Sequence, residues 1–185
     1  MAAVAVAGQQ AGDGSDEDTL LMWILVWSEL VAFGILLAAF LFMSGIHAED
    51  FGLARLHLSP GLAAANTLIL LISGWQAAIA VRHRTEPNAA RRPLCIAAVF
   101  GLLFVAVKFV EYAGELRYTM DATLVRFFEL YFILTGFHLL HVAFGATILF
   151  LVAWRPSRGN ILLITTLWHV IDLVWLVMFP IVYLA

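Results

Sequence analysis

The chain has 185 residues, of which 63% are hydrophobic and 12% are charged, and its formal net charge is -3. Soluble globular domains carry about 25% charged residues and under about 50% apolar ones. The composition therefore indicates a polytopic membrane protein and excludes a soluble enzyme or a nucleic-acid-binding domain. The single cysteine, Cys95, excludes an internal disulfide and a cysteine-based metal cluster.

Residues 1–19 are predicted to form a disordered acidic tail. They include the run GDGSDEDT and no Lys or Arg, so they lack the basic region with which a secretory signal begins. The tail is interpreted as a solvated leader or as a partner-binding arm. Residues 20–185 are expected to form the membrane domain.

Five apolar segments follow, each close to the roughly 20 residues that cross a bilayer as a helix. They cover residues 20–44, 61–81, 93–116, 127–153 and 161–184. Pro60 and Pro93 are expected at helix starts, where the missing N–H has no partner. Strand-like alternation is absent from the sequence, so the predicted fold is all-α, a five-transmembrane-helix bundle.

The basic residues of the loops predict the orientation in the membrane. The loops after the second and fourth spans contain Arg82, Arg84, Arg91, Arg92, Arg155 and Arg158, and the loops after the first and third contain Arg55, Arg117 and Arg126. Cytoplasmic loops carry the excess of basic residues. A cytoplasmic N-terminus places six of these arginines inside and three outside, so the C-terminus is expected outside.

Ionisable side chains occur inside the first and third spans, where facing lipid is costly. Glu29 lies about ten residues into the first span among apolar residues, which favour the neutral form of its acid. In the third span Lys108 and Glu111 are three residues apart and can neutralise each other, with Tyr112 beside them. Glu29 is interpreted either as a packing residue or as a proton carrier, and the pair either as structural or as part of a proton path.

The fourth and fifth spans also carry ionisable side chains, among them three histidines. His138 and His141 share a polar face of the fourth span, and Asp172 is expected to orient a buried His169 three residues away in the fifth. Together with Glu29, these side chains are expected at similar depth. One interpretation is a bis-His haem between His138 or His141 and His169, as in an electron carrier. Two observations argue against a haem. His138 and His141 are crowded on one helix, and bulky residues surround His169.

Several long motifs resemble subunit III of the haem-copper oxidase superfamily, the cytochrome c oxidase type, in its short five-helix form. They are Ser28-Glu29, Glu111-Tyr112, LTGFHLLHVAFG (134–145) and WHVIDLVWLVMF (168–179), in this order and on the expected helices. Longer members of that family have two further N-terminal helices that form a lipid-holding cleft with the rest. The present sequence corresponds to the form without them.

The resemblance implies a non-catalytic subunit with no catalytic residue, cofactor or metal of its own. Such a subunit packs beside the catalytic haem-copper subunit and its other subunits, supports stability and sustained turnover, and in some members aids proton uptake. It would be a multi-pass protein of the bacterial cytoplasmic (inner) membrane, in contact with lipids and serving aerobic electron transport. The buried polar candidates for a functional role are Glu29, Lys108, Glu111, Tyr112, His138, His141, His169 and Asp172.

Two details of the resemblance favour another partner. Lys108 stands where oxidase members more often have Gln, and the last span closes with FPIVYL. Both features are similar to the subunit III homologue that accompanies bacterial nitric oxide reductase. An oxygen-reducing oxidase and a nitric oxide reductase therefore stay open as the complex that this chain joins.

Overall fold

The computed structural model describes the backbone of residues 2–120 and 124–185, and their side chains except at 2–19, 21, 117 and 120. Within these ranges the chain forms helices and no strand, which confirms the all-α prediction. The side chains of residues 1–19 lie outside the described part of the chain. The disordered acidic tail predicted there therefore stays a prediction.

The described chain contains six α-helices and one 3-10 helix. They are α1 (Ala2–Ile46), α2 (Ala48–Arg55), α3 (Pro60–Arg82), α4 (Pro87–Glu115), η1 (Leu116–Met120), α5 (Val125–Trp154) and α6 (Arg158–Tyr183). Five candidate membrane spans follow from length and apolar composition, namely Met22–Ile46 within α1 and the whole of α3, α4, α5 and α6. The prediction of a five-transmembrane-helix bundle is thus confirmed.

Helix α4 begins earlier than the sequence suggested. Pro60 is the first residue of α3, as expected, but the first residue of α4 is Pro87, and Pro93 lies buried inside the helix. The expectation that Pro93 starts a helix was therefore wrong. A proline near a helix start interrupts few hydrogen bonds, so the polar stretch before Pro93 can be helical as well.

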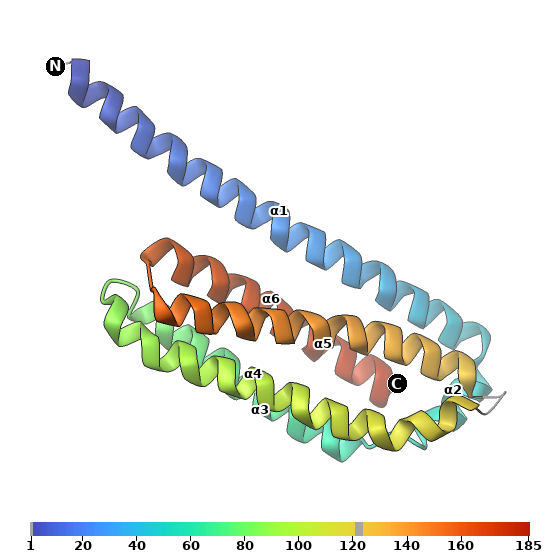
Figure 1. Ribbon diagram of the computed structural model, residues 1–185. Helices are drawn as coiled ribbons and strands as arrows, with labels where there is room; N and C mark the ends of the chain where they lie inside the picture. The colour runs from blue at the N-terminus through green and yellow to red at the C-terminus, as the bar shows by residue number, and fades with distance from the viewer. Residues whose placement is uncertain (1, 121–123) are drawn as a thin grey trace.

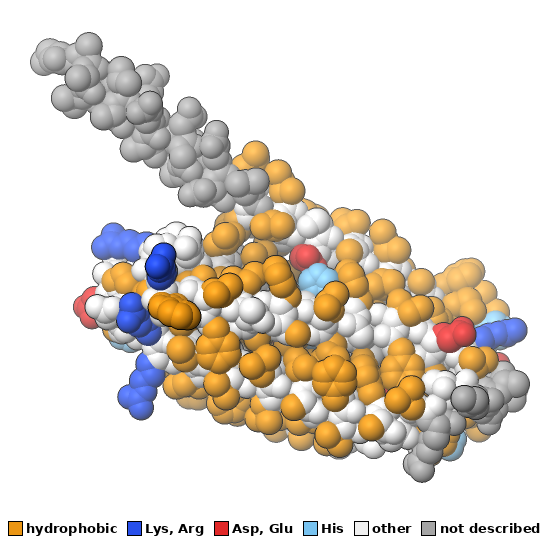
Figure 2. All heavy atoms as spheres, in the orientation of Figure 1, with side chains coloured by type: hydrophobic (Ala, Val, Ile, Leu, Met, Phe, Trp, Pro, Cys, Tyr) orange, Lys and Arg blue, Asp and Glu red, His pale blue; other side chains and the backbone are white. Residues whose placement is uncertain are grey.

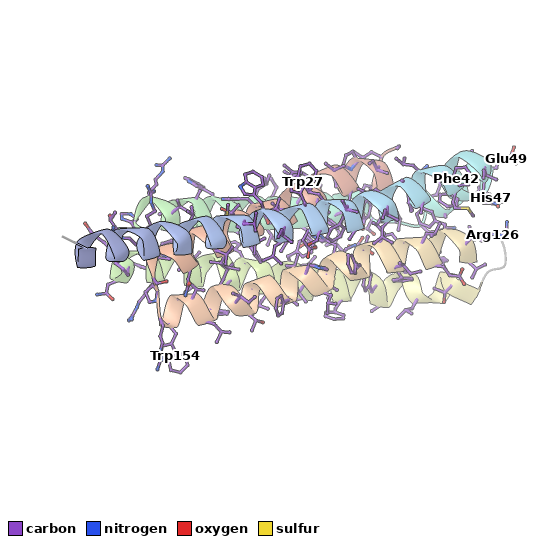
Figure 3. All side chains as sticks on the ribbon, turned by 90° about the horizontal axis from the view of Figure 1, so that it is seen from above. Trp27, Phe42, His47, Glu49, Arg126 and Trp154 are labelled. Carbon is purple, nitrogen blue, oxygen red and sulfur yellow. The ribbon has the colours of Figure 1, made fainter. Side chains whose placement is uncertain are left out.

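Four helices pack side by side and the first lies across them. Helix α3 packs on α4 and α6, and α4 packs on α5, whereas α1 contacts α5 and α6 less extensively. Figure 1 shows α1 diverging from the other helices toward its N-terminal end. In Figure 3, His47, Glu49 and Arg126 lie at one end of the bundle and Trp154 lies at the other.

Trp168 of α6 occupies the centre of the four-helix part and is fully buried. Its ring lies against two glycines, because a Cβ added at Gly101 of α4 would be 2.6 Å from it and one at Gly145 of α5 would be 2.9 Å away. Its indole N–H donates to the Ser73 hydroxyl of α3 at 3.1 Å, and that hydroxyl donates to the carbonyl of Ala97 at 2.7 Å. One side chain thereby sets the spacing of α3, α4 and α5 around α6.

Arg55 of α2 links two helix ends at the end of the bundle where α1 and α6 finish. Its guanidinium donates to the carbonyls of Val182 at 3.2 Å and Ile181 at 3.3 Å, and to the hydroxyl of Ser44 at 3.3 Å. A cation near the last carbonyls of a helix is favoured by the helix dipole. Arg55 therefore connects the end of α1 with the last turn of α6.

The glycine at position 101 gives a direct test of this packing. Trp168 cannot retreat from a new methyl group, because Gly145 and Ser73 hold it from other sides. Gly101→Ala is expected to lower the free energy of unfolding by about 1–3 kcal/mol, as overpacked cores do. The measurement is the thermal unfolding of the detergent-purified protein.

Gly114→Ala is the matched control in the same helix, because no heavy atom lies within 4 Å of the added Cβ. It should unfold at or above the temperature of the unmodified protein. Equal unfolding temperatures for the two variants would show that Trp168 does not control the helix spacing.

Candidate functional site

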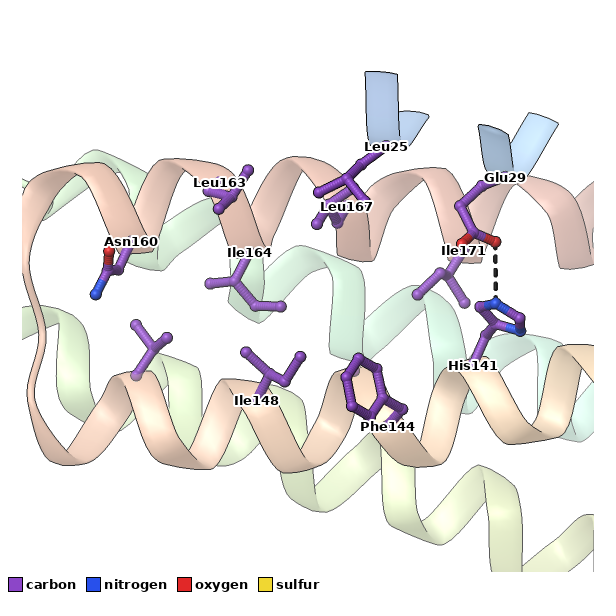
Figure 4. Close-up of a pocket in the computed structure, with 12 residues that line it drawn as sticks. Leu25, Glu29, His141, Phe144, Ile148, Asn160, Leu163, Ile164, Leu167 and Ile171 are labelled. Atoms are coloured by element: carbon purple, nitrogen blue, oxygen red, sulfur yellow. Dashed lines mark ion pairs between the residues drawn. The ribbon is translucent and has the colours of Figure 1, made fainter. Parts of the chain in front are cut away.

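Glu29 and His141 meet across the space between α1 and α5. The Glu29 carboxylate Oε2 lies 3.0 Å from His141 Nε2, and the two side chains are 26% and 20% exposed. Figure 4 shows the pair spanning the gap between the two helices. In Figure 2, an acidic side chain and a histidine lie side by side in the middle of a largely hydrophobic face. The structure thus joins two predicted site residues that are 112 positions apart in the sequence.

The second nitrogen of His141 limits where protons can reside. Nδ1 lies 2.8 Å from the carbonyl oxygen of Phe137, and a carbonyl can only accept, so Nδ1 carries a hydrogen. Nε2 then faces Glu29 Oε2 at 3.0 Å, within ion-pair distance. The contact lacks hydrogen-bond geometry, because Oε2 has no hydrogen-bond partner among the described residues.

A cleft opens beside this pair. It has a volume of about 400 Å³ and is bounded by α1, α5 and α6. Its lining is almost entirely apolar apart from Glu29, His141 and Asn160, with Leu25, Phe144, Ile148, Leu163, Ile164, Leu167 and Ile171 among its residues. Asn160 lies near the start of α6, so the cleft runs from the middle of the membrane toward that end of the bundle.

His138 has a different environment from His141. It is fully buried, and its ring stacks on Trp175 with centroids 5.3 Å apart and an angle of 25°. Phe33 and Phe104 contact the ring edge-on at 5.9 and 5.7 Å. Neither ring nitrogen has a hydrogen-bond partner among the described residues. His138 therefore contributes aromatic packing between α1, α4, α5 and α6 in this structure.

His169 does not lie inside the bundle. Its side chain is 46% exposed, and Nδ1 is 3.8 Å from Oδ2 of Asp172, whose side chain is 9% exposed. The expected proximity of the two residues is confirmed, but the expectation that His169 is buried was wrong. The three-residue spacing places both on one side of α6 without deciding which of them turns inward.

The predicted pairing of Lys108 and Glu111 is confirmed and proves to be part of a larger cluster. Lys108 Nζ donates to Glu111 Oε2 at 3.1 Å, to Tyr131 at 2.9 Å and to Tyr183 at 2.6 Å. Tyr183 in turn donates to Glu111 Oε1 at 2.6 Å. Lys108 and Glu111 are 0% and 4% exposed. This ammonium therefore has three oxygen partners in the interior of the bundle.

Aromatic rings enclose the same ammonium. Nζ lies 5.0 to 5.3 Å from the ring centroids of Tyr112, Tyr131, Trp175 and Tyr183. Tyr112, the remaining predicted residue, also shares a hydrogen bond of 2.7 Å with Thr135. Tyr183 was missed by the sequence interpretation, although its place in FPIVYL, one turn after Pro180, was a usable signal.

The expected convergence of the intramembrane groups is thus only partly observed. Glu29 meets His141, while His138, the His169–Asp172 pair and the Lys108 cluster each have separate surroundings. His138 lies under Trp175 and His169 faces outward, so these two do not form the facing pair that a bis-His haem requires. The geometry fits several structural contacts and one acid–histidine contact at the cleft.

Comparison with known proteins decides the family. The family model described as cytochrome c oxidase subunit III matches residues 19–185. The chain belongs to the cytochrome c oxidase subunit III family. It is a multi-pass membrane protein, and its match to the family covers all five spans.

Individual relatives include subunits of two kinds of oxidase. Cytochrome c oxidase subunit 3 of Thermostichus vulcanus is 27% identical, over 97% of this chain and 93% of its own length. Cytochrome c oxidase subunit 3 of Synechocystis sp. is 34% identical over 69% of this chain and 57% of its own length. A probable quinol oxidase subunit 3 of Staphylococcus epidermidis is 28% identical over 88% of this chain and 86% of its own length.

The carboxyl groups of this site should differ in reactivity toward a hydrophobic carbodiimide, which attacks protonated acids from the lipid phase. Glu29 lines the apolar cleft, where the reagent can reach it, whereas Glu111 is buried and bonded to Lys108. We expect labelling of Glu29 and none of Glu111, measured by peptide mapping. Glu29→Gln is the control and should remove the label. Preferential labelling of Glu111 would contradict this description.

Removal of the Lys108 ammonium should lower the free energy of unfolding. Lys108→Ala leaves the Glu111 carboxylate without its cation, and breaking a buried ion pair in this way costs about 3–5 kcal/mol. We expect little folded protein and early thermal unfolding. Lys108→Gln combined with Glu111→Gln removes both charges and should recover much of the loss. If the double variant is no more stable than Lys108→Ala, charge pairing is not what stabilises the cluster.

Proposed function

We propose that this chain is the non-catalytic subunit III of a haem-copper respiratory oxidase, packed in the membrane beside the catalytic subunit. The observation that carries the proposal is the extent of the family match, residues 19–185, which includes every span and both histidine motifs. Its role is to stabilise the catalytic subunit during sustained turnover, and Glu29 with His141 assists proton uptake.

The distribution of charge supports a location in the bacterial cytoplasmic membrane with the N-terminus inside. The loops between α3 and α4 and between α5 and α6 lie at the same end of the bundle, and the basic side chains gather there in Figure 2. These loops and the adjoining helix ends contain Arg82, Arg84, Arg91, Arg92, Arg155 and Arg158. Basic residues concentrate on the cytoplasmic side of membrane proteins.

An affinity-tagged chain tests the proposal in the cells that produce it. Purification in mild detergent is expected to recover a catalytic subunit with haem and copper, and the complex should reduce oxygen. Reduction of nitric oxide without oxygen reduction would select the alternative partner, which the Lys108 and FPIVYL resemblance suggested. Recovery of the chain without any haem-containing subunit would refute the proposal.

The same complex measures the contribution of Glu29. Glu29→Gln retains shape and can donate a hydrogen bond to His141, but it cannot release a proton. If the pair assists proton uptake, the variant complex loses activity progressively or turns over more slowly, with unchanged subunit composition. Unchanged turnover in a prolonged assay would restrict Glu29 to packing.

We also propose that the cleft between α1, α5 and α6 holds the acyl chain of a membrane phospholipid. Its volume of about 400 Å³ lies within the range of small-molecule sites, and its lining is apolar. The end at Asn160 adjoins Arg158 and Arg155, which suit an anionic headgroup. Lipid would thereby cover the space that the divergence of α1 leaves open.

Filling the cleft tests the lipid proposal. Ile148→Trp places a large ring among the lining residues, whereas Ile133→Trp adds the same ring on the exposed face of the same helix. Native mass spectrometry of the purified protein is expected to show retained phospholipid that Ile148→Trp diminishes and Ile133→Trp does not. Equal retention in both variants would place the lipid elsewhere.

A further inference from the structure

His169 is the most exposed ionisable side chain in the middle of any described span. It lies 11 residues after Arg158, the first residue of α6, which is about 16 Å along the helix at 1.5 Å per residue. Its exposed fraction of 46% compares with 26% for Glu29 and 20% for His141, which contact each other. A polar ring therefore points out of this bundle at mid-membrane depth.

The residues around it form a continuous outward-facing row on α6, which we call the outer row. At 100° per residue, the row covers the positions of 162–176 that lie between about 20° on one side of His169 and about 60° on the other, and beyond the first edge Thr165 and Asp172 are buried. Its members are Leu162, Thr166, His169, Leu173 and Leu176, and the three leucines are 46%, 53% and 41% exposed. The outer row extends over about four turns of the helix, and no element of the described part of the chain covers it.

The outer row is separate from the proposed lipid cleft. The cleft is lined by Leu167 and Ile171, each two positions from His169. Two positions correspond to about 200° around the helix, so the two surfaces face nearly opposite directions. A lipid in the cleft cannot reach His169.

The contacts of the two ring nitrogens of His169 show which hydrogen-bond partners the ring lacks. Nδ1 faces the Asp172 carboxylate at 3.8 Å, and Asp172 is held against Gly74 of α3, where an added Cβ would overlap Oδ2. The opposite nitrogen, Nε2, has no hydrogen bond to any described residue. At 3.8 Å the Nδ1 contact is too long for a hydrogen bond, so the ring nitrogens have no hydrogen-bond partner among the described residues.

An unpartnered ring nitrogen facing hydrocarbon is unfavourable, and histidines in membrane spans normally face protein or water. We propose that the outer row is the surface on which a transmembrane helix of the catalytic subunit packs, and that a hydroxyl or amide of that helix forms a hydrogen bond with His169 Nε2. This inference rests on the proposed function, because that function supplies the membrane partner. It adds the face of contact and the chemistry of the contact.

Photo-crosslinking in native membranes locates the partner. A benzophenone amino acid replaces Leu173 in the outer row, which leaves His169 intact, or replaces Leu140, which is 66% exposed on α5. The probe at position 173 is expected to give an adduct with the catalytic subunit, and the probe at position 140 is not. An adduct only from position 140, equal adducts from both, or an adduct with a second copy of this chain would overturn the assignment.

Substitution of the histidine tests the hydrogen bond. His169→Leu is expected to weaken retention of the catalytic subunit about threefold, the size typical of one interhelical hydrogen bond in a membrane. Thr166→Ala is the control in the same row, because the Thr166 hydroxyl already donates to Leu162 at 2.8 Å within its own helix. Equal retention in both variants would exclude a hydrogen bond between the partner and His169.

The two proposals fail in distinguishable ways. If the unmodified chain recovers no haem-containing subunit, the proposed function is wrong, and the crosslinking result has no bearing on it. If that subunit is recovered but position 173 gives no adduct with it, the function stands and the outer row is not the interface.

Discussion

The contact of Trp168 with two glycines is the constraint on which the arrangement of α3 to α6 depends. Helices in a membrane gain little from the hydrophobic effect on association, so close packing and interhelical hydrogen bonds must hold them together. Gly101 and Gly145 allow the ring to lie between two backbones, and Ser73 joins its N–H to a third helix. The positions of the functional side chains on these helices follow from that spacing.

Two of the intramembrane charged groups find partners on other helices of the same chain. Lys108 obtains three oxygen atoms and four ring faces, and Glu29 obtains His141. The surroundings of the Lys108 cluster and of the Glu29–His141 pair differ. The Lys108 cluster is enclosed, which suits a permanent structural role, whereas the Glu29–His141 pair borders a cleft.

Local contacts could be predicted from the sequence, and contacts between helices could not. Lys108 and Glu111 are three positions apart, so helix geometry alone brings them together. The Ser73 partner of Trp168 is 95 positions away, and only the packed bundle reveals it. His169 shows the limit most clearly: periodicity placed it on one side of α6 with Asp172, but which neighbour covers that side depends on the whole assembly.

Helix α6 contacts the core, the cleft and the outer surface with different sides. One side carries Trp168 and Trp175 into the core, a second lines the cleft with Leu167 and Ile171, and a third presents His169 outward. A helix that is apolar almost all round belongs in a membrane or in the core of a large protein. Here the described chain covers α6 only in part, and a histidine that faces hydrocarbon on the uncovered side is unfavourable. In the proposed complex, a helix of the catalytic subunit would cover this side of α6 and supply the partner that His169 lacks.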